Sequence, residues 1–194
     1  MSVSSNVVVR KTTKKDLGDI INMIQELADF EGMSNGPQLT VEKLARDGGF
    51  DEASPLPVPI FHSFVLELTE SDRTEDNKEK FTSSVSNEEP LTRTSVIGYA
   101  IYFYSYSTWQ GKSLFLEDLY VKTDFRNLGY GKLLFRTVAR HARETDCMRL
   151  DFHVLAWNPA KKFYHRMGAE NLTESEQWEL FRLSRKAIDR IEEN

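Results

Sequence analysis

The segment from Tyr120 to Leu134, YVKTDFRNLGYGKLL, constrains the fold more than any other part of the chain. A β-branched and aromatic run leads into it, and Gly129 and Gly131 stand one residue apart near its end. Apolar residues then recur at the spacing of one helix face, at Leu133, Leu134, Val138 and Ala142. Glycines between a strand and a helix let the backbone approach a phosphate, which the N–H groups at the helix N-terminus attract. A solvated turn would show the same glycines, so the motif alone leaves both interpretations open.

The rest of the chain alternates between strand-like and helix-like patterns. Extended runs rich in β-branched and aromatic residues predict strands at 6–10, 60–68, 95–107, 113–121, 148–155 and 178–184. Apolar residues at helical spacing, with Thr40 as a cap and Gly32, Gly48 and Gly168 as stops, predict helices at 13–31, 41–47, 131–145 and 158–168 and in the tail from Lys186. This order predicts an α/β fold with a mixed sheet and no internal repeat.

Length and composition favour a single soluble domain. The chain has 194 residues and a formal net charge of -5, which argues against non-specific nucleic-acid binding and suits a cationic substrate. The single cysteine, Cys147, excludes an intramolecular disulfide, and the N-terminus has no apolar signal-peptide core. No run reaches the length of a membrane span, so we expect a cytoplasmic protein. Residues 69–93 are polar, and we interpret them as a loop insertion in one domain of residues 1–194.

The glycine loop allows two cofactor assignments. Asp151 lies 20 residues beyond Gly131, which partly fits the fingerprint of a dinucleotide-binding enzyme. However, Leu134 stands where that fingerprint needs its third glycine, and a hairpin rather than a strand–helix–strand unit precedes the loop. An NAD-dependent oxidoreductase is therefore disfavoured.

The wider spacing supports the second assignment. Arg126, Gly129 and Gly131 form R-x-x-G-x-G, which resembles the pyrophosphate-binding motif Q/R-x-x-G-x-G/A of the GNAT family of N-acetyltransferases. Four segments, one of which contains this motif, resemble its diamine acetyltransferases, and within these the thialysine (S-aminoethylcysteine) N-epsilon-acetyltransferase branch: ELADFEGM, YSTWQGKSLFLEDLYV, FRNLGYGKLL and NLTESEQWELF. The similarity covers nearly the whole chain except residues 69–93.

The resemblance implies a GNAT fold, with a central, mostly antiparallel twisted sheet flanked by helices, and acetyl-CoA as cosubstrate. It also implies which residues contact acetyl-CoA, through the backbone beside the pantetheine arm, the pyrophosphate loop and the turn before a later helix. They are Leu119, Tyr120, Val121, Arg126, Asn127, Leu128, Gly129, Tyr130, Gly131, Lys132, Asn158, Pro159 and Ala160.

Acetyl transfer to an amine needs a base for the amine and a proton for the leaving thiolate. Glu117 and Asp118 interrupt the apolar strand LFLEDLYV, where carboxylates are costly unless they have a partner or a function. The resemblance implies that Glu117 takes the amine proton through water and that Asp118 helps to hold a second cationic group. It also implies that Tyr164 is the acid, although related sequences usually have one more residue between the asparagine at Asn158 and this tyrosine.

The resemblance places further residues against the amine: Phe30, Glu31, Asp151, Phe152, His153, Glu176 and Trp178. Asp151 and His153 alternate on one face of their strand, so both are candidates for lining a cleft. No histidine spacing indicates a metal site, and we expect none.

The leading hypothesis is an enzyme that acetylates a small primary amine. A thialysine- or lysine-like amino acid is the first candidate substrate and a polyamine the second, and the resemblance implies a homodimer. A protein acetyltransferase would share fold and cosubstrate. A non-catalytic acetyl-CoA-binding protein is the remaining alternative, although the presence of Glu117 and Tyr164 argues against it.

Overall fold

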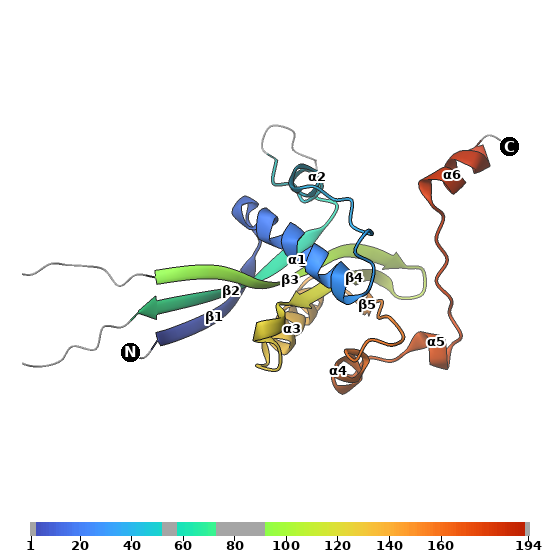
Figure 1. Ribbon diagram of the computed structural model, residues 1–194. Helices are drawn as coiled ribbons and strands as arrows, with labels where there is room; N and C mark the ends of the chain where they lie inside the picture. The colour runs from blue at the N-terminus through green and yellow to red at the C-terminus, as the bar shows by residue number, and fades with distance from the viewer. Residues whose placement is uncertain (1–2, 52–57, 73–91, 193–194) are drawn as a thin grey trace, which may run out of the picture. The chain divides into compact units, whose positions relative to one another are not determined.

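The computed structural model describes residues 3–51, 58–72 and 92–192. The chain forms two compact units, residues 1–153 and residues 154–194. The described part of the first unit contains the strands and helices β1 (Val3–Lys11), α1 (Leu17–Phe30), α2 (Val41–Asp47), β2 (His62–Asp72), β3 (Thr92–Ser107), β4 (Gly111–Val121), α3 (Tyr130–Glu144) and β5 (Leu150–Phe152). Figure 1 shows these elements along the chain.

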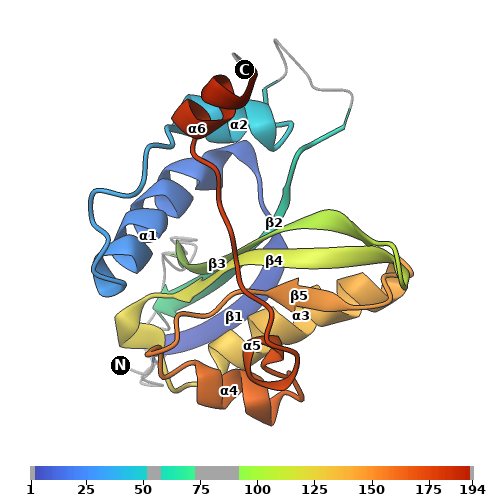
Figure 2. The same ribbon diagram turned by 90° about the vertical axis from the view of Figure 1, so that its right-hand side faces the viewer.

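The strands form one sheet in the order β1-β2-β3-β4-β5 (Figure 2). The pairs from β1 to β4 are antiparallel, and β5 joins β4 in parallel. The predicted mixed and mostly antiparallel sheet is therefore confirmed. A parallel neighbour needs a crossover connection, and α3 supplies it between β4 and β5.

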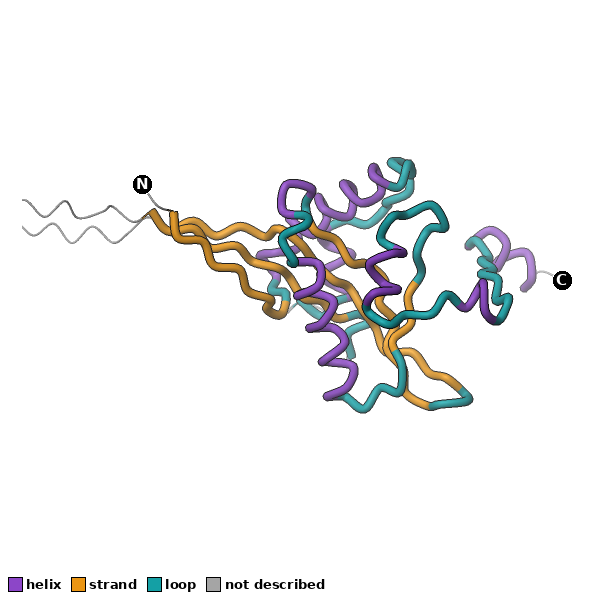
Figure 3. The backbone as a smooth tube through the Cα atoms, turned by 90° about the horizontal axis from the view of Figure 1, so that it is seen from below, coloured by secondary structure: helices purple, strands orange, loops and turns teal. Residues whose placement is uncertain are grey.

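Helices cover both faces of this sheet, with α1 and α2 on one side and α3 on the other (Figures 1 and 3). On the α1 side, apolar residues at helical spacing on α1, such as Leu17, Ile20 and Met23, pack against Tyr99 and Tyr120 of the sheet. On the other side, α3 buries Leu134, Val138 and Ala142 of the predicted apolar face, together with Phe135, whereas the predicted Leu133 is exposed. Burial of each large apolar side chain contributes about 1.5–3 kcal/mol, so both layers hold the sheet rigidly beneath the site.

The predicted ends of α2 and the predicted C-terminal end of α1 agree with the structure, whereas α1 begins at Leu17, later than predicted. The Thr40 hydroxyl accepts a hydrogen bond from the N–H of Lys43 at 3.3 Å, which caps α2. Gly32 follows α1 with φ +72°, a left-handed conformation that glycine adopts without a steric penalty.

The polar segment 69–93 differs from its prediction at both ends. Residues 69–72 continue β2 and residues 92–93 begin β3, with Thr69 opposite Thr94 and Glu70 opposite Arg93. Polar side chains can extend a strand when the backbone is paired and opposite charges face each other across it. Residues 73–91, the rest of the predicted loop, lie outside the described residues.

The second unit corrects one prediction and adds one helix. It contains α4 (Lys161–Arg166), α5 (Leu172–Ser175) and α6 (Arg185–Glu192), so the predicted helix at 158–168 is shorter and the helical tail is confirmed. The predicted strand at 178–184 is wrong, because these residues have no regular secondary structure. A strand needs a partner for its N–H and C=O groups, and Leu180, Phe181 and Leu183 are exposed here instead of packed on a sheet.

Candidate active site

A β-bulge in β4 singles out Glu117. Asp118 lies opposite Ile101 of β3 and Leu116 lies opposite Tyr102, so Glu117 between them has no cross-strand partner. An extra residue of this kind breaks the regular alternation of side chains and redirects the strand. The bulge leaves the Glu117 side chain exposed. This carboxylate is therefore accessible to a ligand, while its neighbours in the strand remain in the core.

The same point marks a change at the outer edge of β4. β5 pairs with β4 only from Leu114–Leu150 to Leu116–Phe152. From Glu117 to Val121, β4 pairs with β3 alone in the described part of the chain. Backbone N–H and C=O groups along this edge can therefore form hydrogen bonds with an extended ligand, as they would with an additional strand. Leu119, Tyr120 and Val121, which the family resemblance places beside the pantetheine arm, all belong to this edge.

The glycine loop has the backbone geometry of an anion site. Asn127 and Gly129 have φ values of +64° and +86°, and Gly129 is the N-cap residue directly before α3. Gly129 has no side chain that could cap this end of the helix, so the first N–H groups can serve a ligand. Left-handed residues before a helix turn successive N–H groups toward one point, which attracts an anion. Lys132 is exposed in the first turn of the helix.

Arg126 connects the loop to the sheet and to α1. Its Nε donates a hydrogen bond to the backbone oxygen of Val121 at 2.9 Å. Its guanidinium carbon lies 5.2 Å from the ring centroids of both Phe30 and Tyr120, within the range of a cation–π contact. Arg126 thus fixes the position of the loop relative to β4, in addition to supplying positive charge.

Asp118 lies on the α1 side of the sheet among other acids. The hydroxyl of Tyr99 donates a hydrogen bond to its Oδ2 at 3.0 Å. The pKa of Asp118 is raised to about 6, mainly by burial and also by the negative charges of Glu117 and Glu31, while the hydrogen bond from Tyr99 lowers it. Burial also raises the pKa of Glu31. A cationic group brought here would relieve the repulsion between these carboxylates.

The C-terminal end of α1 contributes the neighbouring residues. Phe30 is its last residue, and Glu31 follows directly. One turn earlier, Glu26 accepts a hydrogen bond from the hydroxyl of Tyr120 at 2.9 Å. This end of α1 and the strand β4 therefore place Glu26, Glu31 and Asp118 on one side of the sheet.

The three candidates at β5 divide between its two faces. Asp151 pairs with Phe115, and the rings of Phe115 and His153 meet edge to face at 5.0 Å, so Asp151 and His153 share one face as predicted. Asp151 also forms a salt bridge with Arg149, at 2.8 Å between Nε and Oδ2. Phe152 points to the other face, where its ring meets Phe135 of α3 at 5.9 Å. Phe152 is therefore part of the packing under α3.

The remaining candidates belong to the second unit. Asn158 accepts a hydrogen bond from the N–H of Ala160 at 2.9 Å, which orders the turn before α4. Tyr164 is half-buried in α4, with the ring of Phe163 edge-on at 5.0 Å. Trp178 donates a hydrogen bond through its Nε1 to Glu176 at 2.6 Å, and both side chains are exposed.

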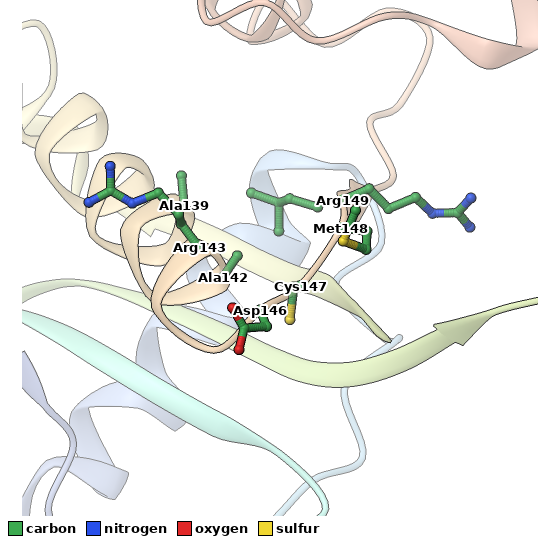
Figure 4. A pocket seen from close by; sticks show the side chains of 8 residues that line it. Ala139, Ala142, Arg143, Asp146, Cys147, Met148 and Arg149 are labelled. Carbon is green, nitrogen blue, oxygen red and sulfur yellow. The ribbon is translucent and has the colours of Figure 1, made fainter. Parts of the chain in front are cut away.

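A surface pocket of about 330 Å³ lies at the opposite end of α3 from the glycine loop (Figure 4). Figure 4 shows Arg143 and Arg149 extending away from each other at its rim. Cys147, which is half-buried, contributes to the lining. Ala139, the lining residue nearest to Gly129 in the sequence, lies about 15 Å from it along α3, so the pocket does not belong to the candidate active site.

The described residues include no group of three or more His, Cys, Asp or Glu side chains that could hold a metal ion. None of the helices in residues 3–51, 58–72 and 92–192 is long and apolar enough to cross a membrane.

Two residues of the site were not among the sequence candidates. Tyr99 and Glu26 each complete a hydrogen bond to a strand residue of the site. Tyr99 alternates with Ile101 like any core residue, so only the three-dimensional contact distinguishes it. Glu26 lies one turn before Phe30, and that spacing is the one signal that could have identified it.

Comparison with known proteins assigns the family. Residues 51–169 match the model of the acetyltransferase (GNAT) family. The chain belongs to this family, and it is an acetyl-transferring enzyme. The dinucleotide-dependent oxidoreductase and the non-catalytic binding protein are thereby set aside.

Named relatives agree with this assignment. The chain is 34% identical to thialysine N-epsilon-acetyltransferase of Bos taurus over 183 residues, which cover 94% of this chain and 95% of the relative. It is 30% identical to human spermidine/spermine N(1)-acetyltransferase-like protein 1, covering 93% of this chain but 23% of that protein. An integron cassette protein from the mobile metagenome of V. cholerae has a similar fold, with a TM-score of 0.64, 18% identity and coverage of 97% and 98% of the two chains.

Proposed function

We propose that this enzyme transfers the acetyl group of acetyl-CoA to a primary amine of a thialysine- or lysine-like amino acid. The observation that carries the proposal is the bulge at Glu117. It presents two adjacent carboxylates at the point where β4 leaves β5 and continues toward a glycine loop with the geometry of a phosphate site. The relatives named as thialysine N-epsilon-acetyltransferases support the choice of amine.

Acetyl-CoA would bind along β4 and over the start of α3. The backbone of Leu119, Tyr120 and Val121 would pair with the pantetheine arm as a strand edge does. The N–H groups from Asn127 to Lys132 would hold the pyrophosphate at the helix N-terminus. Asn158, Pro159 and Ala160 are proposed as further contacts, by resemblance to the family.

The chemistry needs no covalent intermediate on the protein. Glu117 would accept a proton from the substrate ammonium through a water molecule, which frees the nitrogen lone pair. The neutral nitrogen would attack the thioester carbon, and the C–S bond would break as the amide C–N bond forms. Tyr164 would donate its hydroxyl proton to the departing CoA sulfur. The attacking nitrogen would release one proton to solvent, and Tyr164 would regain its proton from solvent.

Specificity would come from acids that match a second positive charge on the substrate. Asp118 and Glu31 are the proposed partners of the α-ammonium group of a thialysine-like amino acid, and Phe30 would pack against its aliphatic stem. Asp151, His153, Glu176 and Trp178 remain proposed contacts with the amine. We also expect a cytoplasmic homodimer, as in the family that the sequence resembles.

A polyamine is the second candidate substrate. The grouping of Glu26, Glu31 and Asp118 on one side of the sheet favours a molecule with several positive charges. The relative named as a spermidine/spermine N(1)-acetyltransferase-like protein supports the same alternative.

An acetylation assay over thialysine, lysine, spermidine, putrescine and a lysine-containing peptide tests the proposal. Release of the CoA thiol gives the rate, and mass spectrometry of the amine identifies the product. We expect the highest kcat/KM for thialysine. A higher value for spermidine would transfer the assignment to polyamines, and acetylation of the peptide alone would contradict both.

A further inference from the structure

Tyr99 occupies an unusual position for a polar side chain. Its residue is completely buried, and it packs in the core cluster with Leu17, Ile20 and Met23 of α1. Its hydroxyl nevertheless reaches Asp118 Oδ2 at 3.0 Å, across the two strands that meet at the bulge. Burial and the adjacent Asp118 raise the pKa of Tyr99 well above its ordinary value. The hydroxyl therefore stays protonated and acts as a donor throughout the range in which the enzyme would work.

The groups that face Asp118 come from three elements. Tyr99 approaches from β3, and Glu117 and Tyr120 flank it on β4. At the C-terminal end of α1, the negative charge of Glu31 raises the pKa of Asp118, and Glu26 accepts a hydrogen bond from the hydroxyl of Tyr120. The guanidinium of Arg126 lies over the Tyr120 ring.

Among the residues that the structure describes, Tyr99 is the one side chain that donates a hydrogen bond to the carboxylate of Asp118. No cationic side chain forms a salt bridge with Asp118 within the part of the chain that the structure describes. The hydrogen bond from Tyr99 opposes the effects of burial and of the nearby acids on the pKa of Asp118. It also uses Oδ2 and leaves Oδ1 for a ligand.

We propose that Tyr99 is a positioning residue, whose hydroxyl orients the Asp118 carboxylate and keeps it ready to receive the second cationic group of the amine. This inference rests on the proposed function, in which Asp118 contacts the substrate. Loss of the hydroxyl leaves the carboxylate with one donor fewer, free to rotate and more easily protonated. The cost falls on substrate binding, because Tyr99 touches neither the reacting amine nor the thioester.

The variant Tyr99→Phe tests the inference, since it removes one oxygen and keeps the ring in the core. We expect the KM for thialysine to rise about tenfold, with kcat at saturating amine within about threefold of the parent value. We also expect the acidic limb of the kcat/KM profile to move to higher pH by about half a unit or more, because the hydrogen bond that lowers the pKa of Asp118 is gone.

Two controls separate this role from a general effect on the core. Tyr102→Phe removes a hydroxyl from a tyrosine of the same strand that is also buried but points to the α3 face, and it should leave KM and the pH profile unchanged. A simple alkyl monoamine lacks the second cation, so its KM should be nearly equal in the parent enzyme and in Tyr99→Phe.

The outcomes also distinguish the inference from the function on which it rests. A parent enzyme that acetylates thialysine, with an unchanged KM and pH profile in Tyr99→Phe, overturns the inference alone. An equal rise in KM for the monoamine likewise overturns it, since it indicates a structural defect. A parent enzyme that acetylates no amine overturns the proposed function, and the inference with it.

Discussion

At the scale of single residues, Asp118 shows how a functional group costs stability. Its carboxyl is largely buried beside Glu31 and Glu117, and its pKa is raised to about 6 in the folded chain. A raised pKa means that folding favours the neutral form, so this stabilisation is complete at low pH and is lost as the pH rises through about 6. The carboxylate that we propose as the partner of a substrate cation therefore destabilises the fold while no cation is bound.

The variant Asp118→Asn tests this cost. The amide has nearly the same shape, can still accept the Tyr99 hydrogen bond and carries no charge to desolvate. We expect the variant to have a higher free energy of unfolding than the parent. This difference between variant and parent should be larger at pH 8 than at pH 4.5, by on the order of 2 kcal/mol. Urea unfolding at the two pH values measures the difference, and exposed Asp124→Asn is the control. An equal effect at both pH values would show that Asp118 does not carry this cost.

Tyr164 has a different role, because it is proposed to act only in the chemical step. Tyr164→Phe keeps the ring beside Phe163 and removes the proton that the leaving thiolate would take. We expect kcat to fall by about a hundredfold, with thermal stability and acetyl-CoA affinity near the parent values. Tyr106→Phe, at a largely exposed tyrosine, is the matched control for steady-state kinetics. A near-normal rate in Tyr164→Phe would remove this residue from the mechanism.

Sequence and structure contribute unequally at this scale. The acidic pair Glu117–Asp118 could be identified from the sequence, because two carboxylates in an apolar strand violate the local pattern. Tyr99 could not be identified, because a tyrosine in an aromatic strand fits its pattern and only its contact with Asp118 reveals a role.

At the scale of elements, we expect the two glycines of the loop to differ in their effect on acetyl-CoA binding. Gly129 has φ +86°, so an added side chain costs about 1–2 kcal/mol in the backbone and stands where a phosphate would approach. Gly131 is helical, and the nearest atom to an added methyl group is Val121 Cγ2 at 4.0 Å. Gly129→Ala should weaken acetyl-CoA binding by about tenfold or more, whereas Gly131→Ala should bind like the parent. Calorimetry measures both affinities, and equal affinities in the two variants would contradict the anion site.

The bulge and the edge of β4 show what periodicity misses among the elements. Helices α1 and α3 could be predicted, because helical spacing and flanking glycines are local signals. The start of α1 could not, since its N-cap is Asp16 and not the predicted Thr13. The bulge depends on which residues of β3 lie opposite Glu117, and β5 is three residues long because pairing ends at Phe152. Such features depend on strand register, which the sequence does not display.

At the scale of the whole molecule, the sheet and its two helical layers agree with the expected class, and residues 178–184 do not. Their apolar residues resemble a strand, but a strand exists only where another strand satisfies its backbone. The second unit has no strand among its described residues, so the pattern remains extended and exposed. The chain forms two compact units. That residues 1–194 make up a single domain stays a prediction.

The central claim is that acetyl transfer depends on the carboxylate at the bulge of β4. The rate of acetyl transfer from acetyl-CoA to thialysine by Glu117→Gln tests this most directly, with exposed Glu70→Gln as the control. The account predicts that kcat falls about 10²- to 10⁴-fold at neutral pH, because a general base is lost, while acetyl-CoA affinity and thermal stability stay near the parent values. A kcat within about threefold of the parent enzyme would contradict the claim and place the base elsewhere.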